Sequence, residues 1–159
     1  MTMKKILLIF IILLFPFAYG ATLSGGVSQN VDNGFMGNWL VKGSLDSEPV
    51  KGFQAATHQF WNLSKKNNVI VLENRLTGAR GEVKVDEAFS GEKSYLKFTN
   101  ICKNGDPKTY QIILKETPEI YLNGDEFEGI DTFEIKKYKN GTLHQKEVVK
   151  YRIIGKRIH

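Results

Sequence analysis

The chain has 159 residues and carries 22 Lys and Arg against 17 Asp and Glu, which gives a formal net charge of +5. Acidic and basic residues alternate along it without a basic block. This pattern argues against a nucleic-acid partner and against a polybasic membrane-surface segment. Cys102 is the only cysteine, so an internal disulfide is excluded and the core must be stable without one. We interpret Cys102 as a buried thiol.

The first twenty residues have the three parts of a secretory signal peptide. Lys4 and Lys5 precede an uncharged apolar run at 6–17, and the small residues at 18 and 20 suit a signal peptidase. The run is shorter than the about 20 apolar residues that a membrane-spanning helix needs. We therefore expect residues 1–20 to be removed on export to the periplasm or the cell exterior. Loss of the two lysines lowers the net charge from +5 to +3.

The rest of the chain is predicted to be one domain behind a short lead-in. Residues 21–34 are rich in Gly, Ser and Asn, which indicates a flexible segment. Residues 35–159 have the length of a single domain with its own core. Within it, residues 46–57 contain Pro49 and Gly52, so we expect a short helix or an open loop there.

Apolar residues after position 34 recur at every second position, which is the period of strands with one face in a core. Runs of this kind, or short continuous apolar runs, occupy 39–45, 69–72, 82–86, 95–99, 110–115, 132–136 and 151–154. Small residues are expected at several inward positions, where they would leave room inside the sheet: Val41, Gly43, Val71, Val83 and Val85.

Turn-forming residues separate these runs, at 65–68, 77–78, 90–91, 104–107, 123–125 and 140–141. Asn140-Gly141 is the strongest hairpin signal, because a type I′ turn needs positive φ at both central residues. Short strands joined by tight turns are typical of an all-β antiparallel barrel or sandwich. We favour a single barrel of about eight strands, since a closed meander has no exposed edge, and keep a Greek-key sandwich as the alternative. Charged residues on the polar faces argue against an outer-membrane barrel.

Gly37-Asn38-Trp39, at the start of the first expected strand, resembles the first signature of the lipocalins and the wider calycin group. The resemblance implies a barrel of about eight strands in which Trp39 closes the base beneath an Arg from near the last strand. Arg152 and Arg157 are the candidates for that Arg, whose guanidinium would make a cation–π contact with the indole. In this arrangement Gly37, Trp39 and the Arg are structural. The chain lacks the family's Thr-Asp-Tyr motif and its cysteine pairs.

Five aromatic residues are the candidate ligand-binding residues: Phe60, Trp61, Tyr95, Tyr110 and Phe133. Phe60 and Trp61 are adjacent in one expected strand, so they lie on opposite faces and one of them points inward. A wall around a bound ligand and an ordinary filled core both use aromatics in this way, and the sequence leaves both open.

No other sequence pattern predicts a metal-binding or catalytic site. Residues 123–131 concentrate carboxylates at 125, 126, 128 and 131, but their spacing differs from that of an EF-hand loop, and we favour a solvated turn. The histidines lack metal-ligand spacing, and no nucleophile-elbow motif is present. We therefore predict no metal site, no cofactor and no catalytic residue.

Together these observations predict an exported, soluble barrel that binds a small apolar ligand in its interior. The alternative is an envelope-associated module without a ligand cavity, which recognises a protein or a glycan through an exposed strand edge or aromatic patch. An enzyme ranks last, because no acid–base, nucleophile or metal constellation can be identified.

Overall fold

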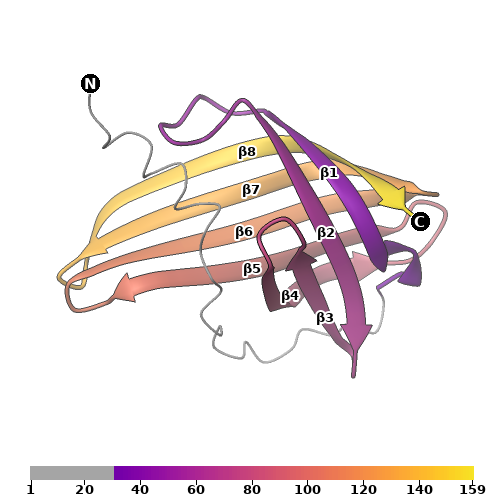
Figure 1. Cartoon of the computed structure of the whole chain (residues 1–159), viewed down its shortest axis with the longest axis horizontal. Helices are drawn as coiled ribbons and strands as arrows, with labels where there is room; N and C mark the ends of the chain where they lie inside the picture. Colours follow the sequence, from indigo (N-terminus) through magenta and orange to yellow (C-terminus); the bar gives the residue numbers. More distant parts are fainter. Residues whose placement is uncertain (1–30) are drawn as a thin grey trace.

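The computed structural model describes residues 31–159, which form an antiparallel β-structure (Figure 1). Its elements are η3 (Asn33–Phe35), β1 (Gly37–Leu45), β2 (Ala56–Lys66), β3 (Val69–Asn74), β4 (Ala79–Phe89), β5 (Tyr95–Asp106), β6 (Tyr110–Asn123), β7 (Glu126–Lys139) and β8 (Thr142–Ile158). The expected signal peptide, 1–20, and residues 21–30 of the expected lead-in lie outside the described residues. Within residues 31–159, no helix has the length and apolar character needed to cross a membrane.

The eight strands form a closed barrel. Each strand pairs antiparallel with the next one in the chain, and β8 pairs with β1 to complete the circle. The prediction of a single antiparallel barrel is therefore confirmed over the sandwich. The turn between β7 and β8 is also confirmed, because Asn140 and Gly141 have φ of 51° and 77°, the positive values that a type I′ turn requires.

The barrel has a short-stranded side and a long-stranded side. β3 has 6 residues, whereas β6 and β7 have 14 each and β8 has 17. β4 pairs with β5 only as far as Thr99, and β1 pairs with β8 only from Tyr151 onward. As a result, β5–β8 continue past the barrel as a four-stranded sheet (Figure 1). One end of the barrel is therefore open beside this sheet.

Residues 31–34, the described part of the expected lead-in, and the 46–57 segment both have defined places. Val31 is buried in the core, and the Asp32 side chain accepts a hydrogen bond from the Gly34 backbone N–H, 2.8 Å away, at the start of η3. Residues 46–55 form a loop rather than a helix, so β1 and β2 are joined across the open end. Hydrogen bonds from Leu45 to Ala55 and from Asp46 to Lys150 hold the two ends of this loop.

Side chains alternate between the interior and solvent, with one correction to the inward positions predicted from the sequence. Val41, Val83 and Val85 are buried, but Val71 is only half-buried and lies between the buried Ile70 and Leu72. The run 69–72 is apolar throughout, so its inward phase cannot be derived from alternation. Pairing of Leu63 with Leu72 sets the phase that turns Val71 outward.

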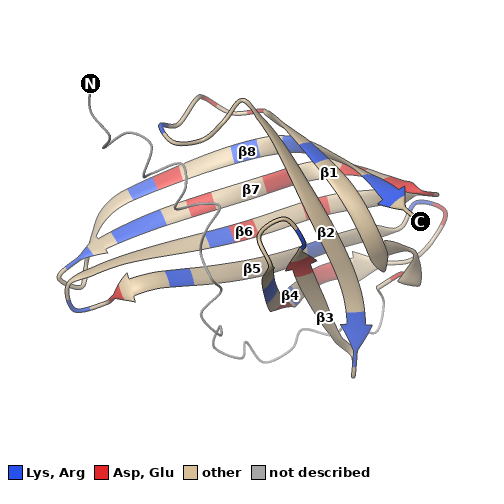
Figure 2. Cartoon of the chain, viewed as in Figure 1, with Lys and Arg blue, Asp and Glu red and all other residues tan. Residues whose placement is uncertain are grey.

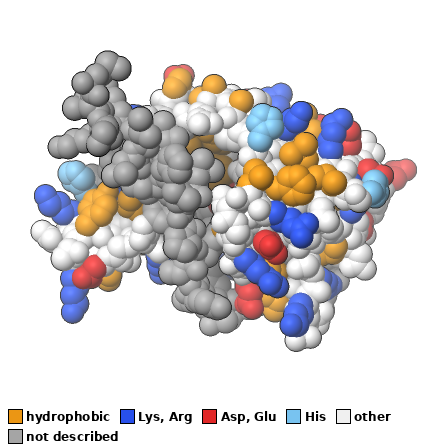
Figure 3. Space-filling view, in the orientation of Figure 1, with side chains coloured by type: hydrophobic (Ala, Val, Ile, Leu, Met, Phe, Trp, Pro, Cys, Tyr) orange, Lys and Arg blue, Asp and Glu red, His pale blue; other side chains and the backbone are white. Residues whose placement is uncertain are grey.

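Lys, Arg, Asp and Glu residues are spread along the strands, with both signs of charge on most of them (Figure 2). On the face drawn in Figure 3, they lie among exposed hydrophobic side chains. Glu134, for example, accepts ion pairs from Lys136 at 2.8 Å and Lys146 at 2.7 Å, and these contacts lower the pKa of Glu134 to about 2.

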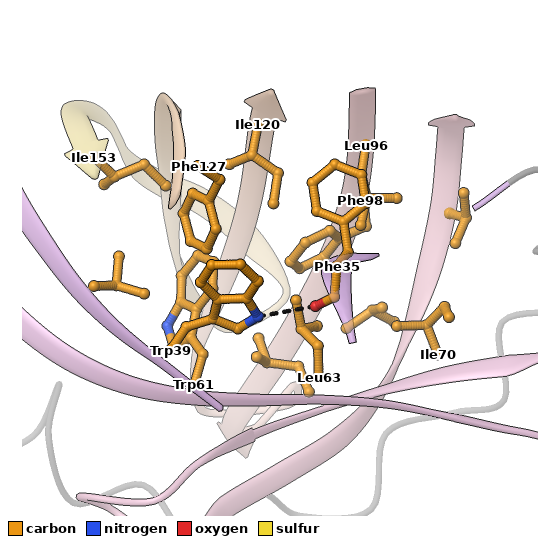
Figure 4. Packing of buried hydrophobic residues seen from close by; sticks show 14 of the residues in the cluster. Phe35, Trp39, Trp61, Leu63, Ile70, Leu96, Phe98, Ile120, Phe127 and Ile153 are labelled. Atoms are coloured by element: carbon orange, nitrogen blue, oxygen red, sulfur yellow. Dashed lines mark hydrogen bonds between the residues drawn. The ribbon is translucent and has the colours of Figure 1, made fainter. Parts of the chain in front are cut away.

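Large apolar side chains fill the end of the barrel beside η3, which we call the closed end (Figure 4). Phe127 lies between two indoles, with ring centroids 4.9 Å from Trp39 and 5.8 Å from Trp61. The Trp39 indole N–H donates to the Phe35 carbonyl at 2.9 Å, so this buried polar group is satisfied. Gly155 makes room for the Phe127 ring, because an added Cβ there would lie 2.2 Å from a ring carbon.

Candidate ligand-binding cavity

A cavity of about 370 Å³ lies at the other end of the barrel, which we call the open end. Strands β2–β8 supply its walls, and the β1–β2 loop borders it through Gly52, Phe53 and Gln54. The Tyr151 hydroxyl donates to the Gln54 carbonyl at 2.8 Å and so connects β8 to this loop. The cavity therefore lies between the packed core and a loop that is bonded to the barrel.

One part of the cavity wall is apolar and aromatic. Its main members are Phe53, Trp61, Leu72, Leu114, Phe133 and Tyr151. Phe133 meets Tyr151 edge-on at 5.9 Å between ring centroids and Phe53 at 6.3 Å. Such contacts hold the rings in fixed orientations, so the wall is a defined surface.

The other part of the wall carries amide and carboxyl groups from four strands: Gln59, Asn74, Asn100 and Glu116. The Trp61 indole N–H donates to Gln59 Oε1 at 2.7 Å, and Asn100 Nδ2 donates to Glu116 Oε2 at 3.2 Å. Among the described residues that line the cavity, none is Lys or Arg. The site therefore offers hydrogen-bonding groups and a carboxyl group, and its one basic side chain among these residues is the exposed imidazole of His58.

A second carboxyl group lies beside Glu116. Asp131 is 1 % exposed, and its position in β7 alternates inward with Phe127 and Phe133. In the register of β6 and β7, Glu116 pairs with Phe133 and Pro118 pairs with Asp131, so the two acids are diagonal neighbours. The Asp131 oxygens have no hydrogen-bond partner in the described part of the chain apart from the Glu116 carboxyl group.

Burial of this acid pair changes the ionisation of both members. It raises the pKa of Asp131 well above the usual range, and the nearby Glu116 charge raises it further. Burial also raises the pKa of Glu116, although the hydrogen bond from Asn100 opposes the change. Two adjacent carboxyl groups cannot both ionise easily, so this pair holds a proton more strongly than an exposed carboxyl group does.

Cys102 also lines the cavity, where it is half-buried. Burial raises the pKa of its thiol. Since the thiolate is the nucleophilic form, Cys102 acts here as a small apolar wall residue.

The cavity brings together two of the five candidate ligand-binding aromatics, Trp61 and Phe133. Phe60 lies on the opposite face of β2 from Trp61 and is half-buried. Tyr95 packs between Phe89 and Tyr121, whose rings lie 5.2 and 4.8 Å away. Tyr110 is exposed at the start of β6, beyond the open end.

Glu116 was not identified from the sequence. Asp131 was counted with the acidic segment 123–131 and expected in a solvated turn, which is wrong for this residue, because it is 1 % exposed within β7. A signal was present, because each acid occupies an inward position in a strand whose other inward positions are apolar. In β6 these neighbours include Leu114 and Ile120, and in β7 they include Phe127 and Phe133. A carboxylate on the apolar face of a strand indicates a buried polar site.

The residues predicted to be structural are at the closed end. The Arg157 guanidinium carbon lies 4.4 Å from the Trp39 ring centroid. Arg157 also donates to the Met36 carbonyl at 2.8 Å and to the Gly34 carbonyl. Gly37 accommodates this Arg, since an added Cβ would lie 2.8 Å from its Nη1 atom.

Arg152, the other candidate for the Arg above Trp39, is on the outer face, where it pairs with Asp46 at 3.3 Å. Of the two candidates, Arg157 therefore occupies the position above the indole.

The acidic segment 123–131 does not converge on one point. Asp125 pairs with Arg157 at 2.8 Å and Glu126 with Lys156 at 2.9 Å, whereas Asp131 is inside the barrel. Across residues 31–159, no group of three or more His, Cys, Asp or Glu side chains is placed to hold a metal ion.

The chain matches no protein-family model, no curated protein and no solved structure. The resemblance to lipocalins therefore depends on the eight-stranded closed barrel and on the arrangement of Gly37, Trp39 and Arg157.

Proposed function

We propose that this protein is an exported binding protein that holds one small, largely apolar molecule at the open end of its barrel. The observation that carries this proposal is the cavity of about 370 Å³. Ligand sites are typically clefts of about 300–1,000 Å³ with mostly apolar walls and a few polar groups. The aromatic wall and the amide and carboxyl groups of this cavity have that composition.

The contrast between the two ends supports the proposal. Protein interiors are packed closely, and a void loses the dispersion contacts of the atoms around it. At the closed end the same strands bury Trp39, Phe98 and Phe127, none of which lines the cavity. A space confined to one end is what a site for a ligand requires. The signal-peptide features of residues 1–20 support a periplasmic or extracellular location.

Binding of a neutral fluorophore, N-phenyl-1-naphthylamine, tests the proposal. We expect fluorescence enhancement with one site per chain, and native mass spectrometry of freshly purified protein should show a bound small molecule. Leu114→Trp fills the cavity from its wall and is expected to weaken fluorophore binding by about tenfold or more. Leu143→Trp is the matched control, because Leu143 is exposed on β8. Equal binding by the two variants, or no binding by the original protein, would contradict the proposal.

One observation favours the alternative of a module that recognises a protein or glycan. Phe89 and Tyr121 are 47 % and 39 % exposed; Phe89 stacks on Tyr95, and Tyr121 contacts Tyr95 with its ring tilted by 43°. Lys93 lies 5.2 Å from the Tyr121 ring centroid. Exposed aromatic platforms of this kind mark binding surfaces. Loss of envelope-partner or glycan binding in Phe89→Ala, with fluorophore binding unchanged, would assign this second function.

A further inference from the structure

Glu116 in the cavity wall and Asp131 buried next to it differ from the other acidic residues of the described chain. Eight of those acids have a Lys or Arg within 4.0 Å: Asp46, Asp86, Glu119, Asp125, Glu126, Glu128, Glu134 and Glu147. The acids without such a partner elsewhere lie where water can solvate them, whereas Asp131 is 1 % exposed. Neither Glu116 nor Asp131 has a basic partner within residues 31–159.

This arrangement leaves a carboxyl group in the cavity wall, and a second one buried next to it, without a Lys or Arg partner in the described chain. A buried ion is unfavourable unless an opposite charge or hydrogen bonds compensate it. Asn100 supplies one hydrogen bond to Glu116, but the described lining contains no Lys or Arg, and its one imidazole, His58, is exposed. A cation bound next to Glu116 would favour the ionised form of the carboxyl group. The missing component is a cation that enters from outside.

The aromatic residues next to the acid pair fit the same ligand. Phe133 is directly opposite Glu116 in the β6–β7 register, and Tyr151 is directly opposite Asp131 in the β7–β8 register. Both rings line the cavity. An ammonium group supplies three hydrogen-bond donors for carboxyl oxygens, and aromatic faces attract it further. Carboxyl groups flanked by aromatic rings are therefore a suitable environment for an alkylammonium group.

We propose that the cavity selects small molecules that carry a protonated amine on an apolar body, with the ammonium group held by Glu116 beside Phe133 and Tyr151. Asp131 is buried next to Glu116, outside the lining. This inference rests on the proposed function, because it requires that the cavity holds a ligand. The apolar body would lie against Leu72, Leu114 and Phe53, the other apolar residues of the wall. The amine would also take the place of the missing basic side chain beside Glu116.

Three probes of similar shape and different charge test the inference: 2-phenylethylamine, 2-phenylethanol and phenylacetate. Each is added to the full chain with bound N-phenyl-1-naphthylamine, and displacement is measured at neutral pH. We expect the amine to bind about tenfold or more tighter than the alcohol, and phenylacetate to bind weakest. If 2-phenylethanol or phenylacetate displaces the fluorophore as well as 2-phenylethylamine does, or better, the inference is overturned.

Variants identify the groups that select the amine. Glu116→Gln keeps the shape of the side chain and removes its charge, so the preference for amine over alcohol should disappear while fluorophore affinity stays within about threefold. Glu119→Gln is the matched control on the same strand, because Glu119 pairs with Lys97 at 3.1 Å on the outer face. A preference that persists in Glu116→Gln overturns the assignment.

The outcomes separate the two proposals. Fluorophore binding without any preference for the amine overturns the inference, while the proposed function as a binding protein still stands. Absence of fluorophore binding overturns the proposed function itself. The three-probe series on the unaltered protein needs no substitution, so it decides the inference even where Glu116→Gln fails to fold.

Discussion

The two ends of the barrel are built from the same strands and differ in what occupies the interior. At the closed end the inward positions are large and apolar, and Trp39, Phe98 and Phe127 fill the space completely. At the open end the inward positions of those strands include Gln59, Asn100 and other polar residues, and a cavity remains. β2 shows the change within one strand, since Leu63 and Trp61 lie in the core and Gln59 lines the cavity.

This difference indicates that the two ends of the barrel have different roles. The closed end supplies stability through packing, together with an Arg157 guanidinium that bonds the backbone before β1. The open end carries polar groups whose burial is unfavourable for stability, and such groups are retained at functional sites. Substitutions at the two ends should therefore have different consequences.

The largest expected effect comes from removing the Trp39 indole. Trp39→Ala should lower the free energy of unfolding by about 3–5 kcal/mol, because a fully buried aromatic is lost and a cavity is left. Phe133→Ala at the open end should lower it by about 1–2 kcal/mol, because that ring is half-buried against existing space. Urea titration of both variants measures the difference. An equal loss for the two variants would remove the distinction between the ends.

A smaller effect is expected when a methyl group is added at the closed end. In Gly155→Ala the new Cβ meets the Phe127 ring at 2.2 Å, so the ring must move within a filled core. Overpacking of this kind lowers the free energy of unfolding by about 1–3 kcal/mol. Gly91→Ala is the control, because an added Cβ there meets nothing within 4 Å. Thermal unfolding of the pair checks this, and an unchanged midpoint for Gly155→Ala would show that the closed end is loosely packed.

The smallest expected effect concerns pH and the open end. The pKa of Asp131 is raised in the folded protein, so its contribution to stability is complete below the unfolded pKa of about 3.9 and is lost as pH rises through the folded value. Glu116 and Tyr151, the titratable groups that act on Asp131 from β6 and β8, also have raised pKa values. Between pH 5 and pH 7.5, the free energy of unfolding of Asp131→Asn should therefore rise by on the order of 1 kcal/mol relative to that of the original protein.

Urea unfolding at both pH values measures that gain. The Glu134 cluster serves as an internal reference, because its pKa of about 2 keeps its contribution constant above pH 5 and removes it only in stronger acid. A gain for Asp131→Asn that is the same at both pH values would contradict the raised pKa.

The predictions from sequence succeeded where local chemistry decides the structure. Asn140 and Gly141 adopt the positive φ values that their side chains tolerate, and alternating segments such as 82–86 have the expected inward residues. Val71 could not be placed in this way, because the apolar run 69–72 has no alternation. Pairing with β2 decides which of its residues point inward. The candidate site was predicted in part, as a wall of aromatic residues. Trp61 and Phe133 line the cavity, whereas Tyr95 and Tyr110 are outside it.

By itself, the sequence determined the β-strands, the hairpin turns and the inward side of most strands, because backbone preferences and a period of two act over a few residues. Only the tertiary structure decided that β8 pairs with β1 and that a cavity remains at the end where the long strands extend beyond the short ones. It also decided that Asp131 is buried next to Glu116 in the cavity wall. These outcomes depend on register between distant segments, which no local pattern encodes.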